Sequence, residues 1–130
     1  MSKKNRSAES KRPPSVPKVM LHLEGLAVLA ACCFFYGRAH FSIGIFALGF
    51  LAPDLAMIGY VANKSVGAAC YNWVHTYVVP VVLAAFLYYT HREGLMWIPL
   101  IWASHIGFDR FLGYGLKYDT DFKSTHLQKV

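Results

Sequence analysis

Charged residues are scarce in this sequence, and acidic residues are the scarcest among them. Only 15% of the 130 residues are charged, with seven Asp or Glu against thirteen Lys or Arg, while 55% are hydrophobic. An ordinary soluble domain carries about 25% charged residues, so this composition argues against that class. The length allows a single domain. Because the apolar residues gather in long runs, we expect an integral membrane protein.

Cysteine is also rare, and its placement excludes a disulfide-stabilised secreted domain. The three cysteines, Cys32, Cys33 and Cys70, are odd in number, and all lie within apolar segments. A small disulfide scaffold would instead use an even set of cysteines. We therefore interpret these three as small residues of the membrane interior.

The basic N-terminal segment lacks the aromatic residues that would stack on bases. Residues 1–18 hold six of the thirteen basic residues, three prolines and a single acid, Glu9. Such a segment has little to bury and is predicted to be disordered. Next to an apolar helix, it is expected to contact anionic lipid headgroups. Membrane lipid is thus the expected partner, nucleic acid is not, and a homo-oligomer is left open.

Four apolar segments separated by short polar turns predict the fold. An all-α, four-span transmembrane antiparallel helix bundle is expected over residues 19–113, helped by small residues such as Gly25, Gly59 and Gly67 at helix contacts. Ten of the thirteen basic residues would then lie on one side, which predicts cytoplasmic termini in a bacterial inner membrane. The predicted spans are residues 19–36, 41–62, 66–90 and 95–112.

The remaining residues, 114–130, are predicted to form a cytoplasmic tail. This segment mixes charge with a few apolar residues, enough to lie on a membrane surface but too few to cross it. Asp119 and Asp121 are interpreted as a solvated acidic turn. Thr125 and His126 would gain a role if the tail folded back over the polar residues of the spans.

Ionisable residues inside the predicted spans mark the candidate site. Given the alternating directions of the spans, Glu24, Asp54, His75, His105 and Asp109 are all expected in the cytoplasmic half of the bundle. Charged groups inside a membrane are costly and therefore tend to face one another. His105 and Asp109, four residues apart on one helix, would share a face. These five residues are the catalytic candidates.

The excess of carboxylates in this group has two physical solutions. A divalent transition metal could bind Asp54, His75, His105 and Asp109, with Glu24 as a base for metal-activated water. Alternatively, the same residues could share protons in a hydrogen-bond network. The residues expected to contact substrate are Tyr71, Asn72, Arg110, Tyr114 and Lys117.

Two function classes follow from these alternatives. The first is a metal-dependent hydrolase that acts on an amphiphilic substrate. The second is a non-enzymatic membrane protein, such as a proton-linked carrier, a channel or an assembly subunit, in which the same residues form a polar network. Polar side chains often join membrane helices without any catalytic role, and His75 is open to that interpretation.

Several motifs resemble those of a bacterial integral membrane family known as domain-of-unknown-function family 4260. The resemblance spans about residues 22–127 and implies a four-span membrane fold, with no activity to carry over. A weaker similarity, to the inner-membrane metal-dependent hydrolases, rests on Pro53-Asp54 and His75-Thr76 alone. The motifs of the first resemblance are Leu23-Glu24-Gly25-Leu26, Leu51-Ala52-Pro53-Asp54-Leu55, Tyr71-Asn72-x-x-His75-Thr76-Tyr77, His105-x-Gly107-x-Asp109-Arg110-x-x-Gly113-Tyr114-Gly115-Leu116-Lys117-Tyr118 and Phe122-x-x-Thr125-His126-Leu127.

Overall fold

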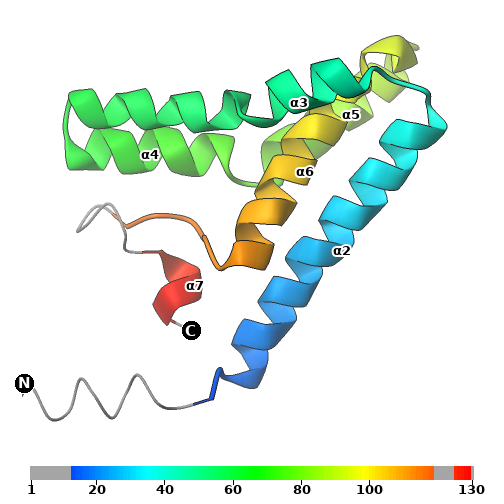
Figure 1. Cartoon of the computed structure of the whole chain (residues 1–130). Helices are drawn as coiled ribbons and strands as arrows, with labels where there is room; N and C mark the ends of the chain where they lie inside the picture. The colour runs from blue at the N-terminus through cyan, green and yellow to red at the C-terminus, as the bar shows by residue number, and fades with distance from the viewer. Residues whose placement is uncertain (1–12, 119–124, 130) are drawn as a thin grey trace, which may run out of the picture.

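The protein is mostly helical in the part of the chain that the structure describes. A computed structural model describes residues 13–118 and 125–129 (Figure 1), so the predicted acidic turn at Asp119 and Asp121 and most of the basic N-terminal segment lie outside it. Within the described ranges, the extended pairing is one isolated antiparallel bridge between Lys117 and Thr125. The elements are α2 (Val16–Arg38), α3 (Ile43–Phe50), the 3₁₀ helix η1 (Ala52–Val61), α4 (Lys64–Val74), α5 (Val78–Tyr89), the 3₁₀ turn η2 (Glu93–Leu95), α6 (Trp97–Leu112) and α7 (His126–Lys129).

Local sequence signals explain where several helices begin and end. Pro17 lies in the first turn of α2, where its missing N–H costs nothing. The side chain of Asn63 accepts a hydrogen bond of 2.8 Å from the Val66 N–H and caps α4. Gly113 ends α6 in the left-handed conformation, with φ of 95°.

Two of the predicted spans are each broken in the middle. The second changes from α3 to the 3₁₀ geometry of η1 around Pro53, which cannot donate a helical hydrogen bond. The third is broken between α4 and α5 at residues 75–77, because the ring of Pro80 would clash with the carbonyl of Thr76 in a continuous helix. We call this second break the α4–α5 joint.

Helices α2 and α6 lie side by side and approach each other through two glycines. A Cβ atom on Gly107 would stand 2.7 Å from the carbonyl oxygen of Gly25, and a Cβ on Gly25 would stand 2.7 Å from that of Gly107. The predicted role of Gly25 at a helix contact is therefore confirmed. Gly59 and Gly67 are likewise confirmed, since they allow η1 and α4 to pack closely as a hairpin.

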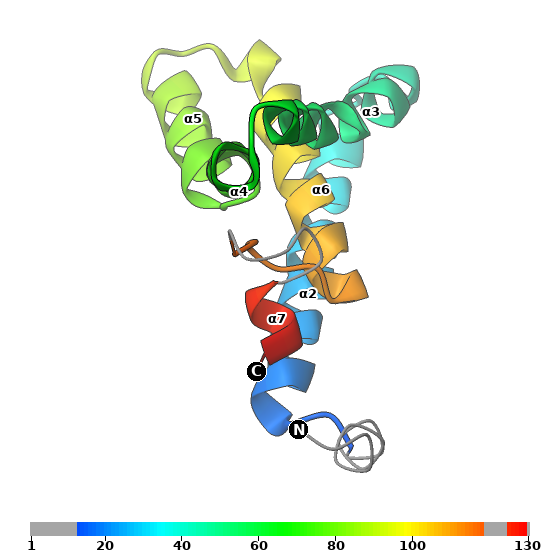
Figure 2. The same cartoon turned by 90° about the vertical axis from the view of Figure 1, so that its left-hand side faces the viewer.

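The arrangement of the helices does not confirm the predicted up-and-down bundle. The η1–α4 hairpin projects away from the α2–α6 pair, and in Figure 2 α4 is seen nearly end-on while α2 and α6 run up the picture. Among the described residues, three segments are long and apolar enough to cross a membrane, Val16–Arg38, Ile43–Val61 and Lys64–Tyr89. Helix α6 has only 16 residues, fewer than the roughly 20 that a span needs. A four-span bundle is thus not confirmed, because the breaks at Pro53 and at the α4–α5 joint redirect the chain.

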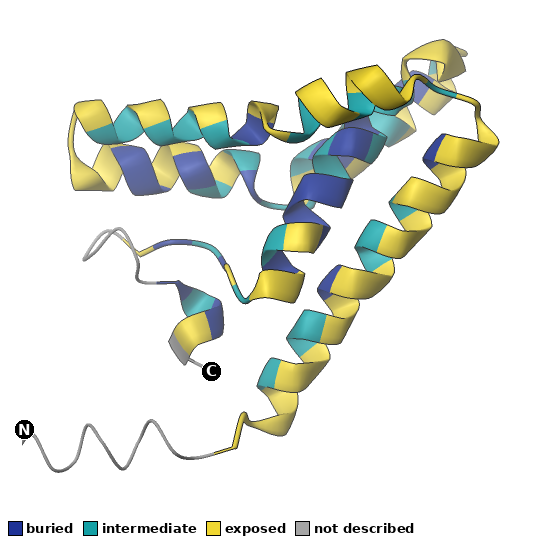
Figure 3. Ribbon diagram, in the orientation of Figure 1, coloured by how far each residue is buried: buried dark blue, intermediate teal, exposed yellow. Residues whose placement is uncertain are grey.

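Apolar side chains cover much of the surface of these segments (Figure 3). Leu48, Ile58, Val61 and Val82, for example, are exposed on α3, η1 and α5. Such a surface would be unfavourable in water but suits contact with lipid. The buried residues instead concentrate along α6, with a smaller group on α4, which packs against η1.

Candidate functional site: an Asp/His cluster

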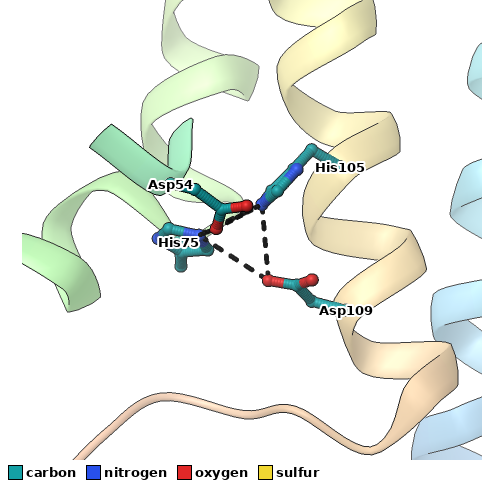
Figure 4. A group of neighbouring side chains, drawn as sticks. All are labelled: Asp54, His75, His105 and Asp109. Atoms are coloured by element: carbon teal, nitrogen blue, oxygen red, sulfur yellow. Dashed lines mark hydrogen bonds and ion pairs between the residues drawn. The ribbon is translucent and has the colours of Figure 1, made fainter. Parts of the chain in front are cut away.

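Four side chains from three elements meet beside the α4–α5 joint (Figure 4). Asp54 comes from η1, His75 follows directly after α4, and His105 and Asp109 lie one turn apart on α6. One potential ligand atom from each residue lies within 4.8 Å of the other three. Four of the five predicted catalytic residues therefore converge.

The spacing of these atoms resembles the edges of a coordination tetrahedron. The two Nε2 atoms of His75 and His105 are 3.2 Å apart. The Asp54 Oδ1 atom lies 3.5 Å from His75 Nε2 and 3.3 Å from His105 Nε2. The corresponding distances from Asp109 Oδ2 are 3.6 and 3.5 Å. Ligands at about 2.0–2.1 Å from a tetrahedral zinc ion stand about 3.3–3.4 Å from one another.

Neighbouring groups orient the two imidazoles. The Nδ1 atom of His75 donates to the carbonyl oxygen of Tyr71 at 2.9 Å, which leaves the lone pair of Nε2 facing the cluster. The ring of Tyr71 stacks on His75 with 3.7 Å between centroids, and its hydroxyl donates to Asp109 Oδ2 at 3.3 Å. The rings of Phe50 and His105 pack edge to face, with 5.3 Å between their centroids. Both histidines are buried, so their positions are set by the fold.

Side chains of α6 also hold the backbone of the α4–α5 joint. Trp102 Nε1 donates to the carbonyl of Val74 at 2.6 Å. Arg110 donates through Nη2 to the carbonyl of His75 at 2.7 Å and through Nη1 to that of Tyr114 at 2.8 Å. On α6, Trp102 and His105 are three residues apart, and Asp109 and Arg110 follow one turn later. One side of this helix therefore both supplies ligand candidates and donates hydrogen bonds to carbonyl oxygens that lose their helical partners at the α4–α5 joint.

A cavity of about 500 Å³ opens on the carboxylate side of the cluster. The side chains of Asp54 and Asp109 are 42% and 14% exposed, whereas that of His75 is fully buried. Any ligand entering the cavity would therefore meet the carboxylates first. The cavity is lined by Asp54, Met57, Tyr71, Asp109, Tyr114, Lys117, Thr125 and Gln128.

The described part of the tail folds back beside this cavity. The side-chain amide of Asn72 donates to the carbonyl of Lys117 at 2.8 Å, and its oxygen accepts the Lys117 N–H at 2.7 Å. His126 Nδ1 accepts the N–H of Leu116 at 2.7 Å, and the backbones of Lys117 and Thr125 are bridged. We call this arrangement the tail clasp.

Two titratable groups of the tail clasp are shifted by their surroundings. Burial lowers the pKa of Lys117, although the carboxylates of Asp109 and Asp54 partly oppose this effect. Burial also lowers the pKa of His126, and the positive charge of Arg110 lowers it further.

The predicted substrate-contact residues have different surroundings. Tyr71, Tyr114 and Lys117 line the cavity, while Asn72 reaches it only through the backbone of Lys117. The guanidinium of Arg110 is bound to backbone carbonyls. Glu24 is exposed on α2 and does not belong to the group of four ligand candidates.

Sequence reasoning missed three residues at this site. Trp102 gave no signal, because a tryptophan in an apolar helix looks like any other core or lipid-facing residue. Thr125 was noted only for the case of a folded-back tail, and Gln128 was not noted. The roles of Thr125 and Gln128 depend on the tail clasp, which joins residues 45 positions apart in the chain.

Comparison with known proteins identifies a family. A family model described as a domain of unknown function, DUF4260, matches residues 18–130. No curated protein and no solved structure matches the chain, so the weaker similarity to metal-dependent hydrolases has no support from these comparisons.

Proposed function

The chain belongs to the DUF4260 family, and from its site we propose that it is a metal-dependent membrane hydrolase acting on an amphiphilic substrate. The proposed location is a bacterial inner membrane, with both termini cytoplasmic. The observation that carries the proposal is the grouping of two imidazole nitrogens and two carboxylate oxygens, 3.2–3.6 Å apart along the five edges that involve a histidine.

The donor set favours a transition metal over calcium or magnesium. Imidazole nitrogens suit zinc, iron and manganese, whereas calcium and magnesium prefer oxygen ligands alone. Two carboxylates also neutralise a divalent cation, which lowers the cost of holding it in a largely apolar protein. Asp54, His75, His105 and Asp109 are the candidate ligands.

A hydrolytic metal needs a position open to water, and Asp54 is the ligand best placed to release one. Catalytic zinc sites keep three protein ligands, whereas four protein ligands are typical of structural sites. Asp54 is the most exposed of the four, and it lies on a 3₁₀ helix that borders the cavity. His75, His105 and Asp109 would then hold the cation.

In the proposed reaction, Asp54 accepts a proton from the attacking water. If His75, His105 and Asp109 hold a divalent cation, that cation would make a bound water molecule more acidic. The water oxygen bonds to the electrophilic phosphorus or carbon of the substrate, and the bond from that atom to the leaving oxygen breaks. Asp54 then returns the proton to the leaving oxygen. Glu24, exposed on α2 outside the cluster, is not needed as the base.

An amphiphilic substrate is supported by a second cavity at the same joint. This cavity, of about 320 Å³, is bordered by Pro53 and Val74, the residues directly before Asp54 and His75. Its walls are almost entirely apolar, in contrast to the polar cavity that contains Lys117. The remaining lining residues are Gly49, Ala52, Trp97, Ile98, Ile101 and Trp102.

The second candidate is a non-enzymatic protein in which the cluster is a structural centre. The observation in its favour is that four protein ligand atoms already lie within 4.8 Å of one another, and four protein ligands are typical of a structural metal site. Such a centre, with or without a metal, would join α6 to the α4–α5 joint in an assembly subunit, a channel or a proton-linked carrier.

Metal analysis of the purified protein in detergent tests both candidates. We expect about one transition-metal ion per chain, lost in His105→Ala and retained in the control His91→Asn, whose imidazole is exposed far from the cluster. Removing the metal from the unmodified protein with a chelator should lower its melting temperature, and adding metal back should restore it. A metal-free protein that is indifferent to chelators would overturn the metal proposal.

The variant Asp54→Ala separates a hydrolase from a structural centre. A hydrolase should keep its metal in this variant but lose the hydrolysis of chromogenic phosphate and carboxylate esters of increasing chain length. A structural centre should instead lose metal affinity together with its fourth ligand, and its unmodified form should cleave none of these esters.

A further inference from the structure

Lys117 brings a buried cation into the polar cavity beside the cluster. It is only 7% exposed and is the one cationic residue among the described residues that line this cavity. Its Nζ atom lies 4.3 Å from the ring centroid of Tyr71, the residue that stacks on His75, and 5.4 Å from that of Tyr60. Two aromatic rings therefore hold the ammonium group near the metal-ligand candidates.

Another polar group in the cavity, the hydroxyl of Thr125, has no hydrogen-bond partner among the described residues. The Oγ1 atom of Thr125 is buried, with the residue 1% exposed, and makes no hydrogen bond to any described residue. Buried hydroxyls nearly always have a partner, so an unpaired hydroxyl that lines a cavity indicates a bound group with a hydrogen-bonding atom. Thr125 and Lys117 are joined through their backbones by the bridge of the tail clasp.

Whether the cavity repels or attracts an anion depends on whether the metal is bound. Asp54 and Asp109 carry two negative charges and Lys117 one positive charge, so the net charge with neutral histidines is minus one. A divalent cation changes this net charge to plus one. An anion should therefore be repelled by the metal-free site and attracted by the metal-loaded one.

We propose that the polar cavity binds a phosphate group, held between the metal, the ammonium of Lys117 and the hydroxyl of Thr125. This inference rests on the proposed function, because it requires the metal. A phosphate offers three terminal oxygens to these three groups, whereas a carboxylate offers only two. The substrate class is thus a phosphate monoester. Asn72 positions Lys117 through its paired hydrogen bonds to the Lys117 backbone.

Binding of inorganic phosphate to the purified protein in maltoside detergent tests the inference. After excess zinc has been removed, calorimetric titration should show phosphate binding to the zinc-loaded protein and none to the chelated protein. Lys117→Ala should weaken phosphate binding at least tenfold, because it removes the ammonium group. The variant keeps the hydrogen bonds between the Lys117 backbone and Asn72. Thr125→Val, which keeps the shape but lacks the hydroxyl, should weaken it several-fold, whereas the control Lys64→Ala, at the exposed start of α4, should not.

The metal content of each sample keeps the two proposals distinguishable. Zinc-loaded protein that does not bind phosphate, or that binds it equally well as Lys117→Ala, would overturn this inference while leaving the metal site intact. Failure to bind zinc or any other divalent transition metal would instead refute the proposed function. Titration with decyl phosphate identifies the source of the group, since tighter binding than inorganic phosphate indicates a lipid-like monoester and equal binding a soluble one.

The role of Asn72 has its own readout. Asn72→Ala should weaken phosphate binding without lowering zinc affinity, because the side-chain hydrogen bonds of Asn72 go to the backbone of Lys117 and not to a ligand candidate. An equal loss of zinc and phosphate affinity would show a general structural effect and contradict the positioning role.

Discussion

The guanidinium of Arg110 holds the carbonyl oxygen of His75, with 2.7 Å between Nη2 and that oxygen. The helix that supplies His105 and Asp109 therefore also fixes the backbone of a third ligand candidate. The sequence predicted that Arg110 contacts a substrate, but the second amino group of Arg110 donates to the carbonyl oxygen of Tyr114. Its contacts support a structural role at the α4–α5 joint.

Replacing Arg110 should therefore destabilise the protein. Arg110→Met would leave two carbonyl oxygens without their donors, and we expect the free energy of unfolding to fall by about 2–4 kcal/mol. Arg110→Lys should recover part of this loss, because one ammonium can reach only one of the carbonyls in good geometry. Thermal unfolding in detergent measures the effect, with the exposed Arg92→Met as control; equal melting temperatures for the two Met variants would contradict the role.

The contact between α2 and α6 makes a second prediction, at Gly107. Its added Cβ would stand 2.7 Å from the Gly25 carbonyl oxygen and 2.9 Å from the Leu29 nitrogen, and backbone atoms cannot rotate away. Gly107→Ala should therefore push the helices apart and lower the free energy of unfolding by about 1–3 kcal/mol. Gly37→Ala is the matched control on α2, since nothing lies within 4 Å of its Cβ; it should be neutral or slightly stabilising. A stable Gly107→Ala protein would show that the helices are not closely packed.

Tyr71 provides a prediction about the support of the metal site. Tyr71→Phe removes the hydroxyl that donates to Asp109 Oδ2 but keeps the ring that stacks on His75. Loss of such a supporting hydrogen bond should weaken zinc binding about tenfold while lowering the melting temperature of the metal-free protein only slightly. A competitive titration with a zinc chelator measures this, with the exposed Tyr88→Phe as control. Unchanged zinc affinity would mean that the hydroxyl does not support the ligand.

The polar residues within apolar segments were the part of the site that the sequence predicted well. Asp54, His75, His105 and Asp109 are costly to bury alone, and this cost predicted that they would face one another. Glu24 did not join them, because a residue near the end of a span can also lie exposed at its surface.

The arrangement of the helices was harder to predict than their existence. The all-α class and the apolar segments follow from composition and length. Whether the third predicted span merely bends before Pro80 or turns away depends on partners far along the chain, such as Trp102 and Arg110, which hold the α4–α5 joint. The tail clasp depends on a similar long-range pair, Asn72 with Lys117.

The tail clasp should open at low pH because His126 must be neutral to support it. Its Nδ1 atom accepts the N–H of Leu116, and a protonated imidazole cannot accept that bond. Burial and the charge of Arg110 lower the pKa of His126 below its ordinary value near 6.5. The unfolded tail therefore binds a proton more readily than the folded tail, so the stabilising contribution is complete above about pH 6.5 and is lost as the pH falls through the lower, folded-state pKa.

Hydrogen exchange at the Leu116 amide, corrected for its intrinsic pH dependence, should show less protection at pH 5 than at pH 7.5. His126→Asn, whose side-chain oxygen can accept the same bond without titrating, should show the same protection at both; if it loses protection like the unmodified protein, another group controls the tail.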